Sequence, residues 1–443
     1  MKPNHHHRPR PRPPRGAATL IVVMLLFFIV SLVAAYAARN LIFEQKTATN
    51  QYRATQALEA AEAGLEWALA MLNGSRIDAN CTPLVPPDFS QNSFRQRYLA
   101  IDINGNYTPR LMSGVGSERE QASCVQAGTG WNCSCPDGVR PTPTVPGSGG
   151  VNPAFRVCFE AVNPPQPGVV RVVSTGRTAF VDQACGDPVE GLAGEAAASV
   201  SVVVALSSAL PVPPSAALTA GRNATLTGTT VTLVNTDPLT NGVTTQVGGA
   251  LNATSTTFTR HSLPGTPGDR SSIVDAQLGS LTPAELFTSH LRMPLATYKG
   301  QPGSVVVDCS ADCANRLNNA VRSNPGRIVW VDAGLNLSTS ISLGTDGEPA
   351  MIVVDGDIAL SGTNVDIVGL LYSQRDISIT GTNLTVRGAV LAARDFSRSG
   401  TNTTIEYNPA HLTQPLLIPP VLTQLHLSSG SLVRVPGSWR DFP

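Results

Sequence analysis

The chain has 443 residues, which is too long for one small core and predicts two or three domains. It carries 31 Lys and Arg against 31 Asp and Glu, so its balanced charge gives no overall attraction to nucleic acid. Aromatic residues make up only 5% of the chain, whereas its 39 Gly and 35 Pro favour turn-rich β structure.

The N-terminus joins a basic, proline-rich segment to a long apolar one. Residues 1–16 contain Lys and Arg but no acidic residue, and their prolines disfavour a helix. Residues 17–38 contain no charged residue, and as a helix of about 33 Å they would cross a bilayer. The positive-inside rule then keeps the basic segment in the cytoplasm and places everything after Arg39 on the other side.

The helical pattern continues beyond this apolar segment. Apolar side chains recur at steps of three and four residues from Leu58 to Leu72, no proline interrupts residues 17–72, and Asn73-Gly74 is a typical helix end. We therefore predict one helix of about 84 Å whose second half packs on a partner. A cleaved signal peptide would have a shorter apolar core, and a membrane anchor with a solvated stalk is the alternative.

This helix resembles the class III leader and N-terminal helix of type IV pilins and pseudopilins. Residues 57–65 are similar to the A-x-x-A-A-E-A-G-L signature of the PilX class of minor pilin-like biogenesis proteins. The resemblance implies that a prepilin peptidase cuts between Gly16 and Ala17 and that the helix is kept as part of a filament core. The expected packing and assembly residues are Ile21, Leu58, Ala61, Leu65 and Leu72.

The sequence departs from the pilin pattern at Ile21. If Ala17 is the first residue of the cut chain, Ile21 is the fifth, where pilins usually have a glutamate. In major pilins this carboxylate is thought to pair with the N-terminal amine of a neighbouring subunit, since an unpaired buried carboxylate is costly. Some minor subunits lack it, including ones assigned to the filament tip. The resemblance therefore implies a minor pilin that primes assembly, sits at the tip, or both.

A cysteine-bearing head is expected over residues 75–208. Short alternating strands are predicted near residues 155–162, 168–181 and 196–207, as an antiparallel sheet against the outer half of the helix. The eight cysteines of the chain follow an export-type segment and predict disulfides whose pairing stays open. Their C-x-C spacing is a poor match to a zinc site. The cysteines are Cys81, Cys124, Cys133, Cys135, Cys158, Cys185, Cys309 and Cys313.

The C-terminal half contains a repeat of nineteen residues. The sequence Ser/Thr-Gly-Thr-Asn recurs with Asn364, Asn383 and Asn402 in register, between strand-like segments. Such a period predicts a β-solenoid, in which the asparagines form a structural ladder at the turns. A matching aspartate row at residues 357, 376 and 395 fits turn structure better than calcium binding or polysaccharide cleavage.

The predicted fold class is thus α+β, with a long N-terminal helix, a small antiparallel head and a C-terminal β-solenoid with a helical insertion. The expected segments are a leader at 1–16, the pilin-like helix at 17–74 with a membrane span at 17–38, the head at 75–208, first solenoid coils at 209–261, an insertion at 262–348, solenoid repeats at 349–410, and a proline-rich tail or cap at 411–443.

The functional expectation is a minor pilin-like component of a type IV pilus, acting in assembly, adhesion and twitching motility. No P-loop, dinucleotide, zincin or serine-hydrolase motif is present, so we expect no enzyme, cofactor or metal. The expected partners are other major and minor pilins, the prepilin peptidase, the inner membrane and a surface or host ligand, but no nucleic acid. The chain would span the inner membrane once, with a periplasmic C-terminal region, and then join the extracellular filament. The alternative is a membrane-anchored solenoid adhesin or polysaccharide-acting enzyme.

Overall fold

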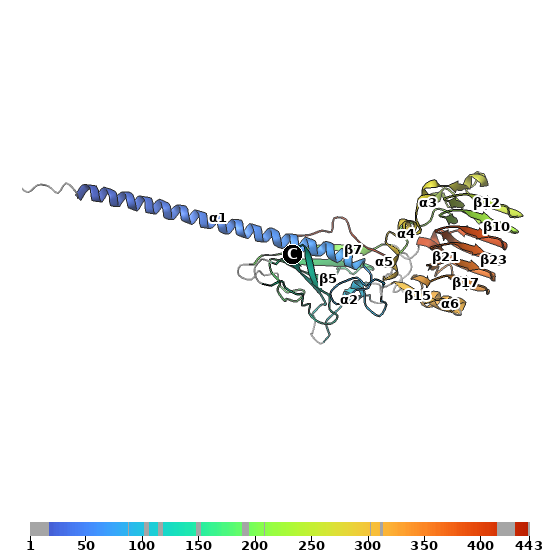
Figure 1. Ribbon diagram of the computed structural model, residues 1–443, viewed down its shortest axis with the longest axis horizontal. Helices are drawn as coiled ribbons and strands as arrows, with labels where there is room; N and C mark the ends of the chain where they lie inside the picture. The colour runs from blue at the N-terminus through green and yellow to red at the C-terminus, as the bar shows by residue number, and fades with distance from the viewer. Residues whose placement is uncertain are drawn as a thin grey trace, which may run out of the picture.

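The computed structural model describes residues 17–86, 88–101, 106–113, 118–147, 152–187, 195–207, 209–301, 303–310, 313–413 and 430–441. Its three parts confirm the predicted fold class. A long helix, α1 (Ala17–Leu72), projects from a small antiparallel head, and a domain of parallel strands lies at the other end of the head (Figure 1). We call this last part the parallel-strand domain.

Helix α1 ends where the sequence predicts. The amide N–H groups of Asn73 and Gly74 donate to the carbonyl oxygens of Ala70 and Met71 in a closing turn. The Asn73 side chain also bonds in both directions to Leu432, with Nδ2 donating to its carbonyl oxygen (2.9 Å) and Oδ1 accepting from its amide (2.7 Å). The end of the helix therefore holds a strand from the C-terminus of the chain.

The head is an antiparallel sheet with α1 packed across its central strands. The strand order is β26-β7-β6-β5-β3-β4, and α1 contacts β5, β6 and β7. Phe94 and Phe155 flank Trp67 of α1, with ring centroids 5.3 and 5.5 Å away. The strands are β3 (Ala122–Ala127), β4 (Gly130–Ser134), β5 (Ala154–Ala161), β6 (Val169–Arg177), β7 (Ala197–Leu206) and β26 (Leu432–Arg434); beside them lie α2 (Phe94–Tyr98), β1 (Leu99–Ile101) and β2 (Tyr107–Pro109).

The parallel-strand domain consists of stacked coils. One sheet has the main path β13-β10-β25-β23-β21-β19-β16-β15, and a second follows the order β12-β9-β24-β22-β20-β17. The early strands are β8 (Leu218–Ala220), β9 (Ala224–Leu226), β10 (Thr230–Val234), β11 (Thr245–Val247), β12 (Leu251–Ala253), β13 (Thr257–His261) and β14 (Ser272–Val274). The later strands are β15 (Ser304–Asp308), β16 (Ile328–Asp332), β17 (Leu335–Leu337), β18 (Ile341–Leu343), β19 (Ala350–Val354), β20 (Ile358–Leu360), β21 (Thr363–Ser373), β22 (Ile377–Ile379), β23 (Thr382–Ala392), β24 (Phe396–Arg398) and β25 (Thr401–Tyr407).

The nineteen-residue repeat sets the register of the later coils. Thr363 pairs with Thr382, and Thr382 pairs with Thr401. Gly369 and Gly388 form a bend inside the long strands, with φ angles of 128° and 145°. A β-carbon on Gly388 would lie 2.0 Å from the carbonyl oxygen of Gly369, so only glycine fits this corner of the stack.

The expected insertion at 262–348 is partly wrong, because its strands belong to the stack. β15 pairs with β16, β16 with β19, and β18 with β21. The nineteen-residue repeat does not extend to these coils, because Ile328 pairs with Met351, which is a shift of twenty-three residues. Among the described residues of this segment, a short 3-10 helix (Gly268–Ser271) precedes β14, and four α-helices depart from the strand pattern: α3 (Ala276–Ser280), α4 (Pro283–Leu291) and α5 (Leu295–Lys299) between β14 and β15, and α6 (Cys313–Ser323) after β15.

The sequence left open whether residues 411–443 are a tail or a cap, and among the described residues it is an early coil that lies against the last one. The last coil is covered by an early one, since β25 pairs with β10 and β24 pairs with β9. The early strand β10 thus lies inside the stack, between β13 and β25. The later strands begin with β15 at the opposite end of the sheet and continue towards β25, beside β10. The tail begins with α7 (Ala410–Thr413), residues 414–429 lie outside the described residues, and β26 pairs with β7 of the head. The parallel-strand domain is therefore inserted within the head sheet.

The two domains meet at the end of α1. Nε2 of Gln301 donates to the carbonyl oxygens of Asn73 (2.8 Å) and Gly74 (3.1 Å). From the head side, Nη2 of Arg95 donates to the carbonyl oxygens of Leu72 and Gly430, both at 3.0 Å. Carbonyl groups at the helix end, which have no partner within the helix, are thus satisfied by both domains.

Candidate functional site

The most distinctive surface is the projecting part of α1. Every described side chain from Thr19 to Tyr52 is exposed, including the continuous apolar segment up to Ala38. By length and composition this helix could cross a membrane. An apolar surface of this size suits lipid or the apolar faces of other helices rather than water.

The PilX-like signature, residues 57–65, is where α1 packs against the head sheet. Ala57, Ala60 and Ala61 are fully or almost fully buried against β6. A β-carbon on Gly176 of β6 would lie 2.1 Å from the carbonyl oxygen of Ala57, and one on Gly64 would lie 2.4 Å from the Ser174 hydroxyl. The small residues of the signature therefore let the helix and the strand come into direct backbone contact.

The predicted packing residues divide into two groups. Ala61, Leu65 and Leu72 are 0%, 2% and 1% exposed and pack within this chain. Leu58 is 37% exposed at the border of the head, and Ile21 is 62% exposed on the projecting part. Only the latter two remain available for contacts with other subunits. Gly16 and the leader lie outside the described residues, and Ala17 is the first residue of α1.

A cleft of about 430 Å³ lies beside α1 where it meets the head. It is lined by Glu59, Glu62 and Glu66 of the helix, and by Arg434 and Trp439 from the C-terminal segment. Arg434 forms an ion pair with Glu66, so this glutamate contacts the C-terminal strand β26. Ion pairs this exposed contribute little to stability.

All eight cysteines form disulfides, as the sequence predicts. Three disulfides lie within the head, and the fourth joins the end of β15 to the start of α6. The pairs are Cys81–Cys135, Cys124–Cys133, Cys158–Cys185 and Cys309–Cys313.

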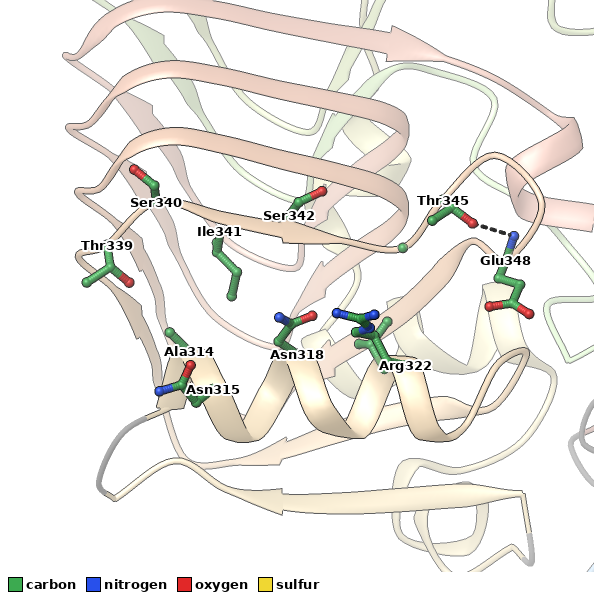
Figure 2. Close-up of a pocket in the computed structure, with 12 residues that line it drawn as sticks. Ala314, Asn315, Asn318, Arg322, Thr339, Ser340, Ile341, Ser342, Thr345 and Glu348 are labelled. Carbon is green, nitrogen blue, oxygen red and sulfur yellow. Dashed lines mark hydrogen bonds between the residues drawn. The ribbon is translucent and has the colours of Figure 1, made fainter.

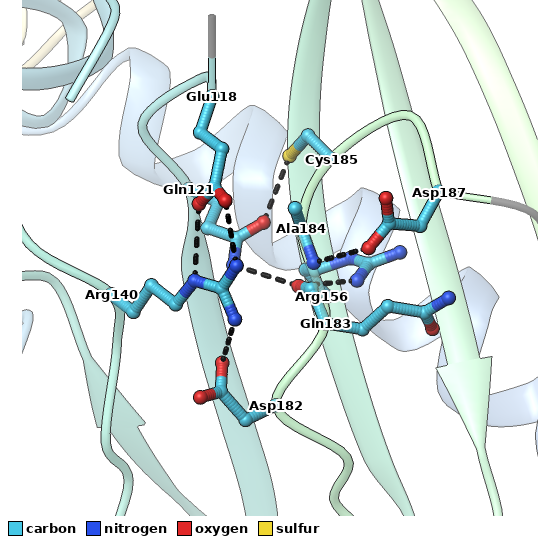
Figure 3. A network of polar contacts seen from close by, with 9 residues as sticks. All are labelled: Glu118, Gln121, Arg140, Arg156, Asp182, Gln183, Ala184, Cys185 and Asp187. Carbon is cyan, nitrogen blue, oxygen red and sulfur yellow. Dashed lines mark hydrogen bonds and ion pairs between the residues drawn. The ribbon is translucent and has the colours of Figure 1, made fainter. Parts of the chain in front are cut away.

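A polar network beside the Cys158–Cys185 bond fixes a loop on the head (Figure 3). Arg140 bonds to Glu118 through two nitrogen atoms and forms an ion pair with Asp182 at 3.4 Å. Arg156 donates to the carbonyl oxygen of Gln183 at 2.6 Å, and burial lowers the pKa of Arg156 to about 10. These contacts hold the segment that follows β6 to the sheet, which is a structural role.

The asparagine row forms a hydrogen-bonded ladder. Asn364, Asn383 and Asn402 all have positive φ angles, between 53° and 59°. Nδ2 of Asn383 donates to Oδ1 of Asn364 at 3.0 Å, and Nδ2 of Asn402 donates to Oδ1 of Asn383 at 3.1 Å. Each side chain thus links its turn to the next coil.

The aspartate row is also engaged in turns. Oδ1 of Asp357 accepts from the amide of Asp376, and Oδ1 of Asp376 accepts from the amide of Asp395. Asn223 continues the row, since its amide and Nδ2 donate to Oδ1 of Asp395. Within the described ranges, no group of three or more His, Cys, Asp or Glu is arranged to hold a metal ion.

Sequence reasoning missed the residues that join the domains. Arg95 and Gln301 satisfy the end of α1 from opposite sides, yet neither stands in a motif that would reveal this. The close approach of Gly176 had a weak signal, a glycine inside a predicted strand, which often marks a close backbone contact.

Comparison with known proteins identifies the N-terminal segment. A family model described as PilX N-terminal matches residues 15–66, which include the apolar part of α1 and the signature. A solved structure of the competence-associated pilin ComZ from Thermus thermophilus aligns over 88% of this chain and 97% of its own, with 12% identity and a TM-score of 0.19. No curated protein sequence matches the chain. The match at residues 15–66 confirms the resemblance drawn from the sequence: this N-terminal segment is similar to the N-terminal region of PilX proteins.

Proposed function

We propose that this protein is a minor component of a type IV pilus that primes filament assembly, sits at the tip, or both. The observation that carries the proposal is the division of α1. One half is fixed in the head through the signature, whereas the other half exposes an uninterrupted apolar surface. Such a helix can leave the lipid bilayer and pack among the helices of other pilins without losing an apolar environment.

The same proposal includes processing and location. The prepilin peptidase removes residues 1–16 by cutting after Gly16, and the chain waits in the inner membrane with its head in the periplasm. The absence of charge from residues 17–38 and the basic residues before them support this orientation. Ile21 and Leu58, which are exposed on α1, are the proposed contacts with neighbouring helices.

Two features favour low copy number. Ile21 supplies no carboxylate for the N-terminal amine of a neighbouring subunit. The parallel-strand domain lies beyond the head, at the end away from the exposed half of α1 (Figure 1). A large domain in this position has free space at a filament tip. In a shaft it would be present in every subunit, and the copies would have to fit beside one another around the filament surface.

A structural role in assembly is favoured over catalysis. The aspartate row, which was the strongest candidate for acid catalysis, accepts hydrogen bonds from backbone amides of neighbouring coils. Carboxylates held in this way stabilise turns.

The test combines mass spectrometry with a gene deletion. We expect the mature chain to begin at Ala17, and we expect the deletion to reduce surface pili and twitching. Complementation by the parent gene should restore both, whereas a Gly16→Val variant should keep its leader and restore neither. Unchanged piliation after deletion would contradict the pilus role, and a mature chain that begins near residue 40 would show that the helix is a discarded signal.

A further inference from the structure

A groove of about 600 Å³ lies between α6 and β18 in the parallel-strand domain. This volume is within the usual range for small-ligand sites. Figure 2 shows Asn318 and Arg322 on the side of α6 that faces β18, with Ser342 on the strand and Glu348 at one end of the groove. The groove is remote in sequence from the pilin helix, and nothing in the proposed assembly role uses it.

The walls of the groove are held in place by contacts outside it. The Cys309–Cys313 disulfide fixes the start of α6, and Leu317 is buried in the core of the domain. β18 is paired in register with β21. A site with preformed walls loses little conformational entropy when a ligand binds.

Several polar side chains in the groove have unused hydrogen-bonding capacity. Among the described residues, no hydrogen bond or ion pair is found for the side chains of Asn318, Arg322, Ser342 or Glu348. Together they provide an amide, a guanidinium, a hydroxyl and a carboxylate, and so both donors and acceptors. The single positive charge of Arg322 is balanced by the single negative charge of Glu348.

This chemistry selects among ligand classes. A nucleic acid or another polyanion would need several cationic side chains, and the groove has one, accompanied by a carboxylate. An apolar ligand would leave the polar side chains unpaired. A sugar has many hydroxyl groups that both donate and accept, and its C–H faces can contact the aliphatic side chains of Val321 and Ile341.

We propose that the groove between α6 and β18 binds a neutral oligosaccharide. Asn318 and Ser342 hydrogen-bond its hydroxyl groups from the two walls, and Arg322 and Glu348 bind hydroxyls at one end. The protein would thereby attach to a carbohydrate-bearing surface through a domain that the helix bundle of a filament leaves free. Binding by the purified chain does not depend on filament assembly, so this inference can fail without affecting the proposed function.

The experiment uses the full chain in detergent on an array of neutral, sialylated and sulfated glycans, followed by calorimetric titration of the strongest binder. We expect a neutral glycan to bind. Asn318→Ala should weaken its affinity about tenfold, and Asn318→Trp, which fills the groove, should abolish it. The matched controls are Asn319→Ala and Asn319→Trp, because Asn319 is exposed on α6 but does not line the groove.

A second pair of variants tests the opposite wall. Ser342→Trp should abolish binding, whereas Ser378→Trp at the centre of β22 should leave it unchanged. Circular dichroism of each variant establishes that the fold is intact. The proposal is overturned if no glycan binds, if only sulfated or sialylated glycans bind, or if a neutral glycan binds the folded Asn318→Trp and Ser342→Trp variants as well as it binds the parent.

Discussion

Gly176 of β6 and Ala57 of α1 are in backbone contact: a β-carbon on Gly176 would lie 2.1 Å from the Ala57 carbonyl oxygen. The same β-carbon would also lie 2.3 Å from the amide nitrogen of Ala61. Because both neighbours are backbone atoms, no side-chain rotation could make room. The position of α1 on the sheet is thus determined by a glycine in the strand and small residues in the helix.

The first prediction concerns this contact. Gly176→Ala should force α1 away from β6 and lower the free energy of unfolding by about 1–3 kcal/mol, the usual cost of overpacking. Gly130→Ala in β4 is the matched control, since its β-carbon would have no atom nearer than 4.0 Å. Denaturant unfolding of the two variants provides the comparison. Equal stability of both would contradict the close contact.

The second prediction concerns the asparagine ladder. Asn383→Ala removes two inter-coil hydrogen bonds and places alanine at a φ angle of 54°. We expect a loss of about 2–3 kcal/mol, from the lost bonds and the left-handed backbone together. Asn383→Gly tolerates the backbone angle and isolates the cost of the bonds. Thermal unfolding should rank the parent above the glycine variant and the glycine variant above the alanine variant. A glycine variant as stable as the parent would show that the ladder does not stabilise the stack.

The third prediction concerns pH. Burial is the main cause that lowers the pKa of His290 below its ordinary value of 6.5, and the nearby Arg292 acts in the same direction. The neutral ring donates from Nδ1 to the Val212 carbonyl oxygen at 2.8 Å. His290 therefore binds a proton more readily in the unfolded chain than in the folded one. The stability from neutral His290 is complete above pH 6.5 and is lost as the pH falls through 6.5 towards the lowered value.

His290→Gln tests this coupling, because glutamine does not titrate. Between pH 7.5 and 5.0 the parent should lose more free energy of unfolding than the variant, measured by urea titration at each pH. The other histidines and the carboxylates titrate in both proteins, so their contributions cancel in the difference. Parallel pH profiles for the two proteins would show that His290 is not buried in its neutral form.

The elements that could be predicted from the sequence are those determined by interactions between residues close in the chain. Helix α1 ends at Leu72 as predicted because its periodicity and the Asn73-Gly74 stop are local signals. The later coils could also be predicted, since Thr363, Thr382 and Thr401 recur every nineteen residues in the sequence and pair with one another in the sheet. The coil that begins at Ile328 was missed because a longer connection before β19 changes the shift to twenty-three residues.

Other parts of the structure depend on contacts that no local pattern reveals. β10 covers β25 although their sequences are far apart, so the stacking order could not be read from the repeat. The return of Leu432 to the head sheet likewise depends on a distant partner, Asn73. The apolar periodicity predicted that the second half of α1 packs on the head sheet, whereas no pattern predicted the groove beside Asn318, which lies between a helix and a strand.

The last prediction compares two disulfides of very different loop length. Cys81–Cys135 closes a loop with a sequence separation of 54, whereas Cys309–Cys313 has a separation of 4. A crosslink restricts the unfolded chain more when its loop is longer, and the chain-entropy relation gives about 4 kcal/mol for the first bond and about 2 kcal/mol for the second. Paired Cys→Ser variants of each bond, compared by denaturant unfolding under oxidising conditions, should show this order. A greater loss from the short loop would mean that the Cys309–Cys313 bond acts mainly by holding α6 in the folded state, and the groove variants would then have to be compared in fully oxidised protein.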